Sequence, residues 1–95
     1  MAVKHFTFNL TATPIELTGL IGTDRKPSQT ICFNSDKLSS DACMIGASTV
    51  TATDYGIHLD ADDTFTFAGE FTSADRFYAR AKNTTAVLHV LVVGA

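Results

Sequence analysis

Hydrophobic and polar residues alternate with a period of two along most of this chain. Near the start, Phe6, Phe8 and Leu10 are separated by threonine and asparagine, a pattern that predicts a strand with one buried face. The alternation returns in short runs up to the end of the chain, whereas the 3.6-residue period of an amphipathic helix does not occur. The runs that predict strands are 6–10, 15–17, 30–34, 43–45, 55–59, 65–67, 77–80 and 85–93.

The last run, Thr85–Val93, is apolar on both faces. A strand of a one-layer antiparallel sheet turns one face to water, and that face is usually polar. We therefore expect one face of this strand to be covered by the protein's own core and the other by a neighbouring molecule. The two predicted faces are Ala86, Leu88, Val90 and Val92 on one side, and Val87, His89, Leu91 and Val93 on the other.

Short strands with turn residues about every 8–12 positions are typical of sandwiches and small barrels. The chain is therefore predicted to be all-β: a single antiparallel β-sandwich, jelly-roll or immunoglobulin-like, with seven or eight short strands and no significant helix. Consecutive strands are expected to pair as hairpins. A length of 95 residues corresponds to one domain, residues 1–95. The polar segment Gly19–Ser28 is expected to be a solvated loop.

Composition narrows the classes of partner. Charged residues make up 18% of the chain, the formal net charge is −3, and the basic residues are scattered rather than clustered. Such a surface has no electrostatic attraction for nucleic acid. The sequence shows neither a secretory signal nor an apolar run approaching the roughly 18 residues of a membrane span, so we expect synthesis in the cytoplasm and no membrane contact.

Three histidines and ten acidic residues invite a catalytic interpretation, but their spacing argues against it. His58 lies four residues from both Asp54 and Asp62, about 13 Å along a strand, and even Asp60 is about 7 Å away. The acidic turn Asp60–Asp63 lacks the spacing of a calcium-binding loop, so solvation of a strand end is favoured over a cation site. The sequence therefore predicts no enzyme, and no catalytic, cofactor-binding or metal-binding residues.

Cys32 and Cys43 are the two cysteines. A hairpin centred near Lys37 and Leu38 would place them roughly opposite each other, which allows a disulfide. A reducing compartment favours two buried free thiols instead. The spacing leaves both states open.

Tyr78 and Arg80 fall on one face of a predicted strand. An aromatic ring beside a cation occurs in cross-strand packing pairs, in protein interfaces and in glycan sites. Together with Tyr55, this pair defines an alternative function as a carbohydrate-binding module, although the chain has no tryptophan to stack on a sugar.

Several short motifs follow one another in a distinctive order. They are Thr30–Asn34, Met44–Gly46, Val50–Thr51, Gly56–Leu59, Phe77–Ala79 and Val87–Val93. This order resembles that of the small β-sandwich virion proteins of tailed bacteriophages, the head decoration or cement proteins and related capsid-fibre modules. The resemblance covers about residues 28–93. The longer turn Ser35–Asp41 and the segment Arg80–Lys82 depart from the pattern, which bears on the virion surface that would be bound.

The resemblance implies a non-enzymatic structural protein of the virion, synthesised in the cytoplasm of a bacterial host and located on the capsid surface. It implies binding to the major capsid protein and to the protein's own copies, as a dimer or trimer, without a cofactor. A tail or connector component is an alternative with the same fold.

We expect the contact surface to include the last strand and the N-terminal segment. Residues 2–6 either add a strand to a neighbour's sheet or form this protein's own first strand, and the second arrangement is favoured. The residues predicted at the interface are Val3, His5, Phe6, Tyr78, Arg80, Leu88, Val90 and Val92.

Overall fold

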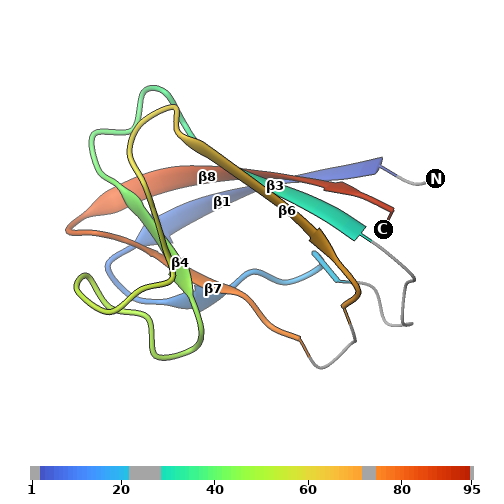
Figure 1. Ribbon diagram of the computed structural model, residues 1–95. Helices are drawn as coiled ribbons and strands as arrows, with labels where there is room; N and C mark the ends of the chain where they lie inside the picture. Colours follow the sequence, from blue (N-terminus) through green and yellow to red (C-terminus); the bar gives the residue numbers. More distant parts are fainter. Residues whose placement is uncertain (1–2, 22–28, 72–74, 95) are drawn as a thin grey trace.

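The computed structural model describes residues 3–21, 29–71 and 75–94, which form eight strands in two antiparallel four-stranded sheets (Figure 1). These ranges contain no helix, so none that could cross a bilayer, and the predicted all-β class is confirmed. In spatial order, sheet A consists of β1 (Val3–Thr11), β8 (Thr85–Val93), β3 (Gln29–Ser35) and β6 (Thr64–Gly69). Sheet B consists of β2 (Ile15–Glu16), β7 (Tyr78–Ala81), β4 (Cys43–Gly46) and β5 (Ile57–Leu59).

Successive strands mostly lie in different sheets. Among the described strands, only β4 and β5 are neighbours both in sequence and within one sheet. Each of the remaining connections between successive strands crosses from one sheet to the other. This is the jelly-roll arrangement, so the immunoglobulin-like alternative is wrong. The expectation of consecutive hairpins is also wrong, because alternating hydrophobicity shows which face of a strand is buried but not which sheet the strand joins.

The core lies between the sheets, where the inward side chains of β8 meet those of β7. Ala79 and Ala81 on β7 are small and fully buried, which leaves room for the large side chains of sheet A. Phe33 of β3 lies in an aromatic cluster, with its ring centroid 5.8 Å from those of both Phe67 and Phe77. The alternation in the sequence therefore identifies the inward faces of β3, β6 and β7, although Phe65 on the edge strand β6 is still 44% exposed.

Strand β8 buries Leu88, Val90 and Val92, which are at most 2% exposed. Their predicted place at an interface is wrong, because these three side chains fill the protein's own core. The sequence shows two apolar faces on this strand without showing which of them turns inward. The outward face includes Leu91, which is 43% exposed. The surface that β8 offers to a partner is therefore the opposite face from the predicted one.

Cys32 and Cys43 are both free thiols and belong to different sheets. Cys43 is buried, as expected, whereas Cys32 is only partly buried, contrary to the expectation of two buried thiols. The hairpin expected near Leu38 does not form, because β3 belongs to sheet A and β4 to sheet B.

The N-terminal segment belongs to this protein's own first strand. Val3 pairs with Val93, and Phe6 pairs with Val90, along the edge of sheet A. The favoured arrangement is therefore confirmed for residues 3–6. Most of the loop predicted at Gly19–Ser28 lies outside the described residues.

The turn between β7 and β8 is held by Asp41, which precedes β4. Its Oδ2 accepts hydrogen bonds from the backbone N–H groups of Asn83 and Thr84, each at 2.7 Å, and its Oδ1 accepts one from Ala42 at 3.0 Å. Burial on its own would raise the pKa of Asp41, but the N–H donors outweigh burial and hold this pKa below its ordinary value.

Candidate interaction face

On the outward face of sheet A, the pairing of the four strands places side chains in rows that run across the sheet. His5 of β1 lies opposite Leu91 of β8, and Leu91 lies opposite Cys32 of β3. Cys32 in turn lies opposite Thr66 of β6. Directly paired residues of antiparallel strands point to the same side, so these four side chains form one row across the sheet.

The outward strand positions of this surface, which we call the sheet A face, carry no permanently charged side chain, although the chain has ten acidic and seven basic residues. Charged residues are similarly depleted from the cores of protein–protein interfaces. The residues of the sheet A face, strand by strand, are Val3, His5, Thr7, Asn9 and Thr11; Thr85, Val87, His89, Leu91 and Val93; Thr30, Cys32 and Asn34; and Thr64, Thr66 and Ala68.

The exposed apolar part of this face lies around Leu91. Leu91 is 43% exposed, and Val3, one row away, is 62% exposed. Val93 pairs with Val3, and Cys32 pairs with Leu91, so the four residues adjoin one another; we call them the Leu91 patch. Single exposed apolar residues are common on proteins, whereas contiguous apolar patches of several hundred Å² mark contact surfaces.

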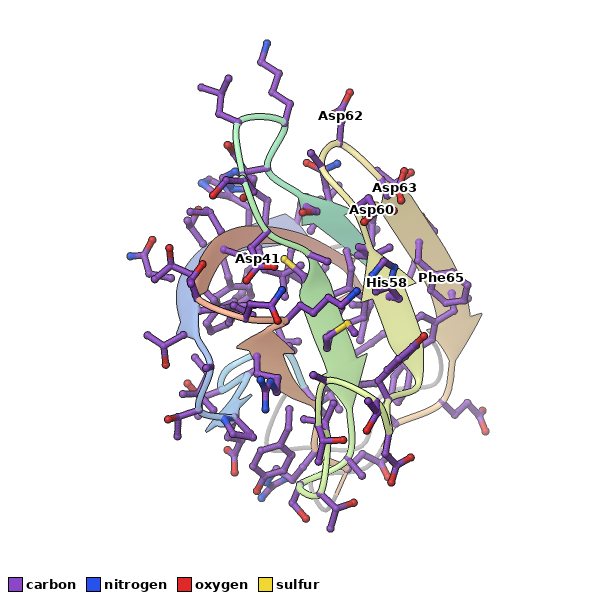
Figure 2. All side chains as sticks on the ribbon, turned by 90° about the vertical axis from the view of Figure 1, so that its left-hand side faces the viewer. Asp41, His58, Asp60, Asp62, Asp63 and Phe65 are labelled. Carbon is purple, nitrogen blue, oxygen red and sulfur yellow. The ribbon has the colours of Figure 1, made fainter. Side chains whose placement is uncertain are left out.

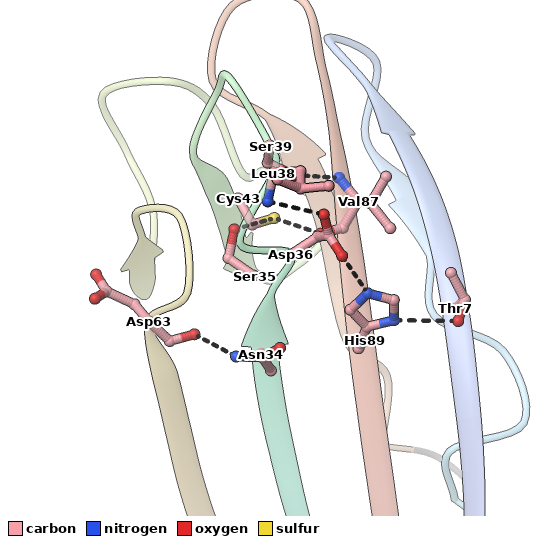
Figure 3. A network of polar contacts seen from close by, with 10 residues as sticks. All are labelled: Thr7, Asn34, Ser35, Asp36, Leu38, Ser39, Cys43, Asp63, Val87 and His89. Carbon is pink, nitrogen blue, oxygen red and sulfur yellow. Dashed lines mark hydrogen bonds and ion pairs between the residues drawn. The ribbon is translucent and has the colours of Figure 1, made fainter.

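A hydrogen-bonded chain crosses the sheet A face where β3 ends (Figure 3). Nε2 of His89 lies 2.8 Å from Oδ1 of Asp36, and Nδ1 of the same ring lies 3.2 Å from Oγ1 of Thr7. The backbone N–H of Leu38 donates to Oδ2 of Asp36 at 3.0 Å. The hydrogen bond from His89, followed by that from Leu38, lowers the pKa of Asp36. These contacts tie the turn after β3 to β8 and β1.

A hydroxyl, an imidazole and a carboxylate in this order resemble the nucleophile, base and orienting acid of a hydrolase. No sequence motif indicates this group, because Thr7 is 82 residues, and Asp36 is 53 residues, from His89. Backbone N–H groups of paired strands lie in the plane of the sheet, so those of β1 and β8 are not directed at the space above Thr7 where an oxyanion would form. The geometry supports a structural link rather than a catalytic site.

Tyr78 and Arg80 lie on the outward face of sheet B, on the other side of the sandwich. The Tyr78 hydroxyl donates to Oε1 of Glu16 at 3.4 Å. The Arg80 guanidinium donates to the carbonyl oxygens of the next two residues, both at 2.9 Å. Their polar groups are therefore bound within the molecule, on a different surface from Val3 and His5.

Val3 and His5 are the predicted interface residues that lie on the sheet A face. Phe6 is on the inward side of β1, where its ring stacks on Phe8 with a centroid distance of 6.1 Å. Leu91 is not among the predicted interface residues, although the doubly apolar pattern of the last strand indicates that its face needs a cover.

In the acidic turn between β5 and β6, the carboxylates of Asp60 and Asp63 contact groups of the same segment (Figure 2). Oδ2 of Asp63 accepts the backbone N–H of Asp60 at 3.0 Å, and Oδ1 of Asp60 lies 3.7 Å from Nε2 of His58. Asp60 is closer to His58 than an extended strand allows, because β5 ends at Leu59 and the chain turns. Within the described ranges, no three His, Cys, Asp or Glu side chains converge on a possible metal site.

The three residues suggested for a sugar platform do not line one site. Tyr55 is 45% exposed and borders a shallow cavity of about 250 Å³ together with Asp54 and Thr49. Tyr78 and Arg80 are not among the residues that line this cavity.

Neither the protein-family models nor the curated proteins give a match to this chain. Among solved structures, the fold is similar to that of a chain from Bacillus endospore appendages, which form a novel family of disulfide-linked pili. The TM-score is 0.54 at 14% sequence identity, and the match covers 96% of this chain and 82% of that chain. At this identity the similarity concerns the fold: this protein is an eight-stranded sandwich of a kind also found in a bacterial appendage.

Proposed function

We propose that this protein is a non-enzymatic structural subunit that packs against other protein chains in an extracellular or virion assembly. The observation that carries this proposal is the sheet A face, which lacks permanent charge and exposes Leu91 and Val3. Covering such a face removes apolar surface from water, which favours association. It does so without the free-energy cost of burying an unpaired charge.

The finer form of the proposal is a head decoration or cement protein on a capsid surface. It is supported by the order of motifs in residues 28–93, which resembles that of the phage virion proteins. The partners would be the major capsid protein and further copies of this chain. Contacts of modest strength, repeated over a shell, add up to a stable assembly.

A subunit of a fibre or tube, which includes the tail or connector alternative, is the second candidate. It is favoured by the similarity in fold to the chain from the disulfide-linked Bacillus appendages, over 96% of this chain. Cys32, a partly exposed free thiol on the sheet A face, would supply a covalent link between subunits in an oxidising location.

Co-sedimentation and electron microscopy test the two forms. A decoration protein should pellet saturably with shells of the major capsid protein of its own virion. Leu91→Glu should weaken this binding at least about tenfold because it places a charge in the contact. Tyr55→Glu is the matched control, since Tyr55 is 45% exposed and belongs to the sheet B side. A fibre subunit should instead form filaments on its own under oxidising conditions. A protein that neither binds shells nor forms filaments contradicts the proposal.

A further inference from the structure

We infer that the sheet A face pairs with the same face of a second copy of this chain, about a two-fold axis. This inference rests on the proposed function and deepens it by naming the partner and the surface. Three properties of the face support it: its charge, its hydrogen-bonding groups and its area.

A two-fold pair brings each surface against itself, so a charged side chain near the axis meets a like charge. The four strands of the sheet A face avoid this repulsion, because none of their outward residues is Asp, Glu, Lys or Arg. The charge that borders the face is the carboxylate of Asp36, which lies just beyond the end of β3 and is hydrogen-bonded to His89. The outward face of sheet B carries Glu16 and Arg80. With a net charge of −3, two copies repel each other elsewhere, and the sheet A face is where they can approach without opposed like charges.

The polar groups of the sheet A face also suit pairing with themselves. Thr30, Thr64 and Thr66 each offer a hydroxyl, which both donates and accepts hydrogen bonds. A hydroxyl can therefore pair with its own copy across a two-fold axis, whereas two carboxylates or two ammonium groups cannot.

The area is sufficient for a weak dimer. Sheet A has four strands of six to nine residues, which at about 4.8 Å between strands and about 3.4 Å per residue span roughly 400–600 Å². This is below the roughly 800 Å² per partner of a standard interface and within the range of transient ones. Leu91 and Cys32 belong to β8 and β3, the two inner strands of sheet A, so the Leu91 patch is placed to be covered fully.

Sedimentation velocity of the full chain tests this inference. The experiment uses reducing buffer at about pH 8, so that Cys32 stays a free thiol and no disulfide joins two copies. We expect a monomer–dimer equilibrium with a dimer Kd between about 10 µM and 1 mM. Leu91→Glu should raise the dimer Kd at least about tenfold, while the control Tyr55→Glu should change it less than about twofold. Thr66→Glu, in the same row on β6, is the second variant, and each is checked for an unchanged unfolding midpoint.

Alkylation of Cys32 shows whether the dimer contact covers the sheet A face. The rate of this alkylation should fall as the protein concentration rises, with the same midpoint as dimer formation. A chain that stays monomeric to about 1 mM, or a dimer that both Leu91→Glu and Thr66→Glu leave intact, overturns the inference. If the protein is monomeric but Leu91→Glu still abolishes shell binding, self-pairing fails and the proposed function stands. A dimer that binds no shell and forms no filament supports the pairing and contradicts the proposed function.

Discussion

Two carboxylates show how single residues hold this small sandwich together. Asp41 accepts three backbone N–H groups and links the start of β4 to the turn before β8. Asp36 accepts hydrogen bonds from Leu38 and His89 and links the turn after β3 to β8. Hydrogen bonds to an ionised acceptor are stronger than neutral ones, and in both cases the fold lowers the pKa of the carboxylate. Both links therefore depend on the ionised form.

Replacing Asp41 by Asn should lower the free energy of unfolding at pH 7 by about 1.5–3 kcal/mol, because a single amide oxygen cannot accept all three N–H groups. The fold lowers the pKa of Asp41, so its contribution is present above the unfolded value of about 3.9 and is lost as the pH falls through the folded value. Urea unfolding of the wild type and Asp41→Asn at pH 7 and at about pH 2.5 measures both effects.

Asp62→Asn is the matched control for this substitution. Asp62 is exposed and has a φ of 65°, which asparagine tolerates, so the change should stay within about 0.5 kcal/mol. A stability difference between wild type and Asp41→Asn that is the same at both pH values would contradict the role given to the ionised carboxylate.

The two thiols should differ in reactivity. Burial raises the pKa of Cys43, whereas Cys32 is partly exposed on the sheet A face. Iodoacetamide treatment of the dilute native protein should therefore give one adduct per chain, located at Cys32 by mass spectrometry. Cys32→Ser should remove that adduct, and unfolding in urea should make both thiols of the wild type reactive. Equal rates at the two cysteines in the native protein would be the contrary result.

At the scale of elements, strands with one apolar face were predictable and their neighbours were not. In β3, Ile31 and Phe33 alternate with less apolar residues, so the pattern alone determines the inward face. In β8 both faces are apolar, and the choice between Leu88 and Leu91 depends on the strands that lie beside it. The link between Thr7 and His89 is equally hidden, because it depends on a register between residues 82 positions apart. Local sequence determines the period of a strand, and long-range packing determines its partners.

The two faces of β8 should respond differently to truncation. Leu88 is fully buried, so Leu88→Ala should lower the free energy of unfolding by about 2–5 kcal/mol through lost burial and a cavity. Leu91 is 43% exposed, and Leu91→Ala should cost less than about 1 kcal/mol in the dilute monomer. Urea unfolding of both variants at low protein concentration compares them directly. Equal losses would mean that the inward and outward faces are assigned incorrectly.

At the scale of the whole molecule, charge is distributed unevenly over the sandwich. Among the residues that the structure describes, no Asp, Glu, Lys or Arg occupies an outward position on the four strands of sheet A. The molecule therefore combines a neutral broad face with an overall negative charge. Such a distribution keeps dilute copies apart while leaving one face free of opposed charges.

Salt should therefore strengthen self-association. At pH 8 the two copies approach with the same net negative charge, and raising sodium chloride from about 20 to 300 mM screens this repulsion without weakening any ion pair across the contact. The dimer Kd should fall by roughly two- to tenfold over this range, as Coulomb's law at the separation of two such molecules suggests. Sedimentation velocity at each salt concentration measures the effect, and Leu91→Glu, which adds a charge to each copy, should show a steeper dependence. An interface that depends on salt bridges responds in the opposite direction, so a Kd that rises with salt would show that the copies pair through a charged surface such as sheet B.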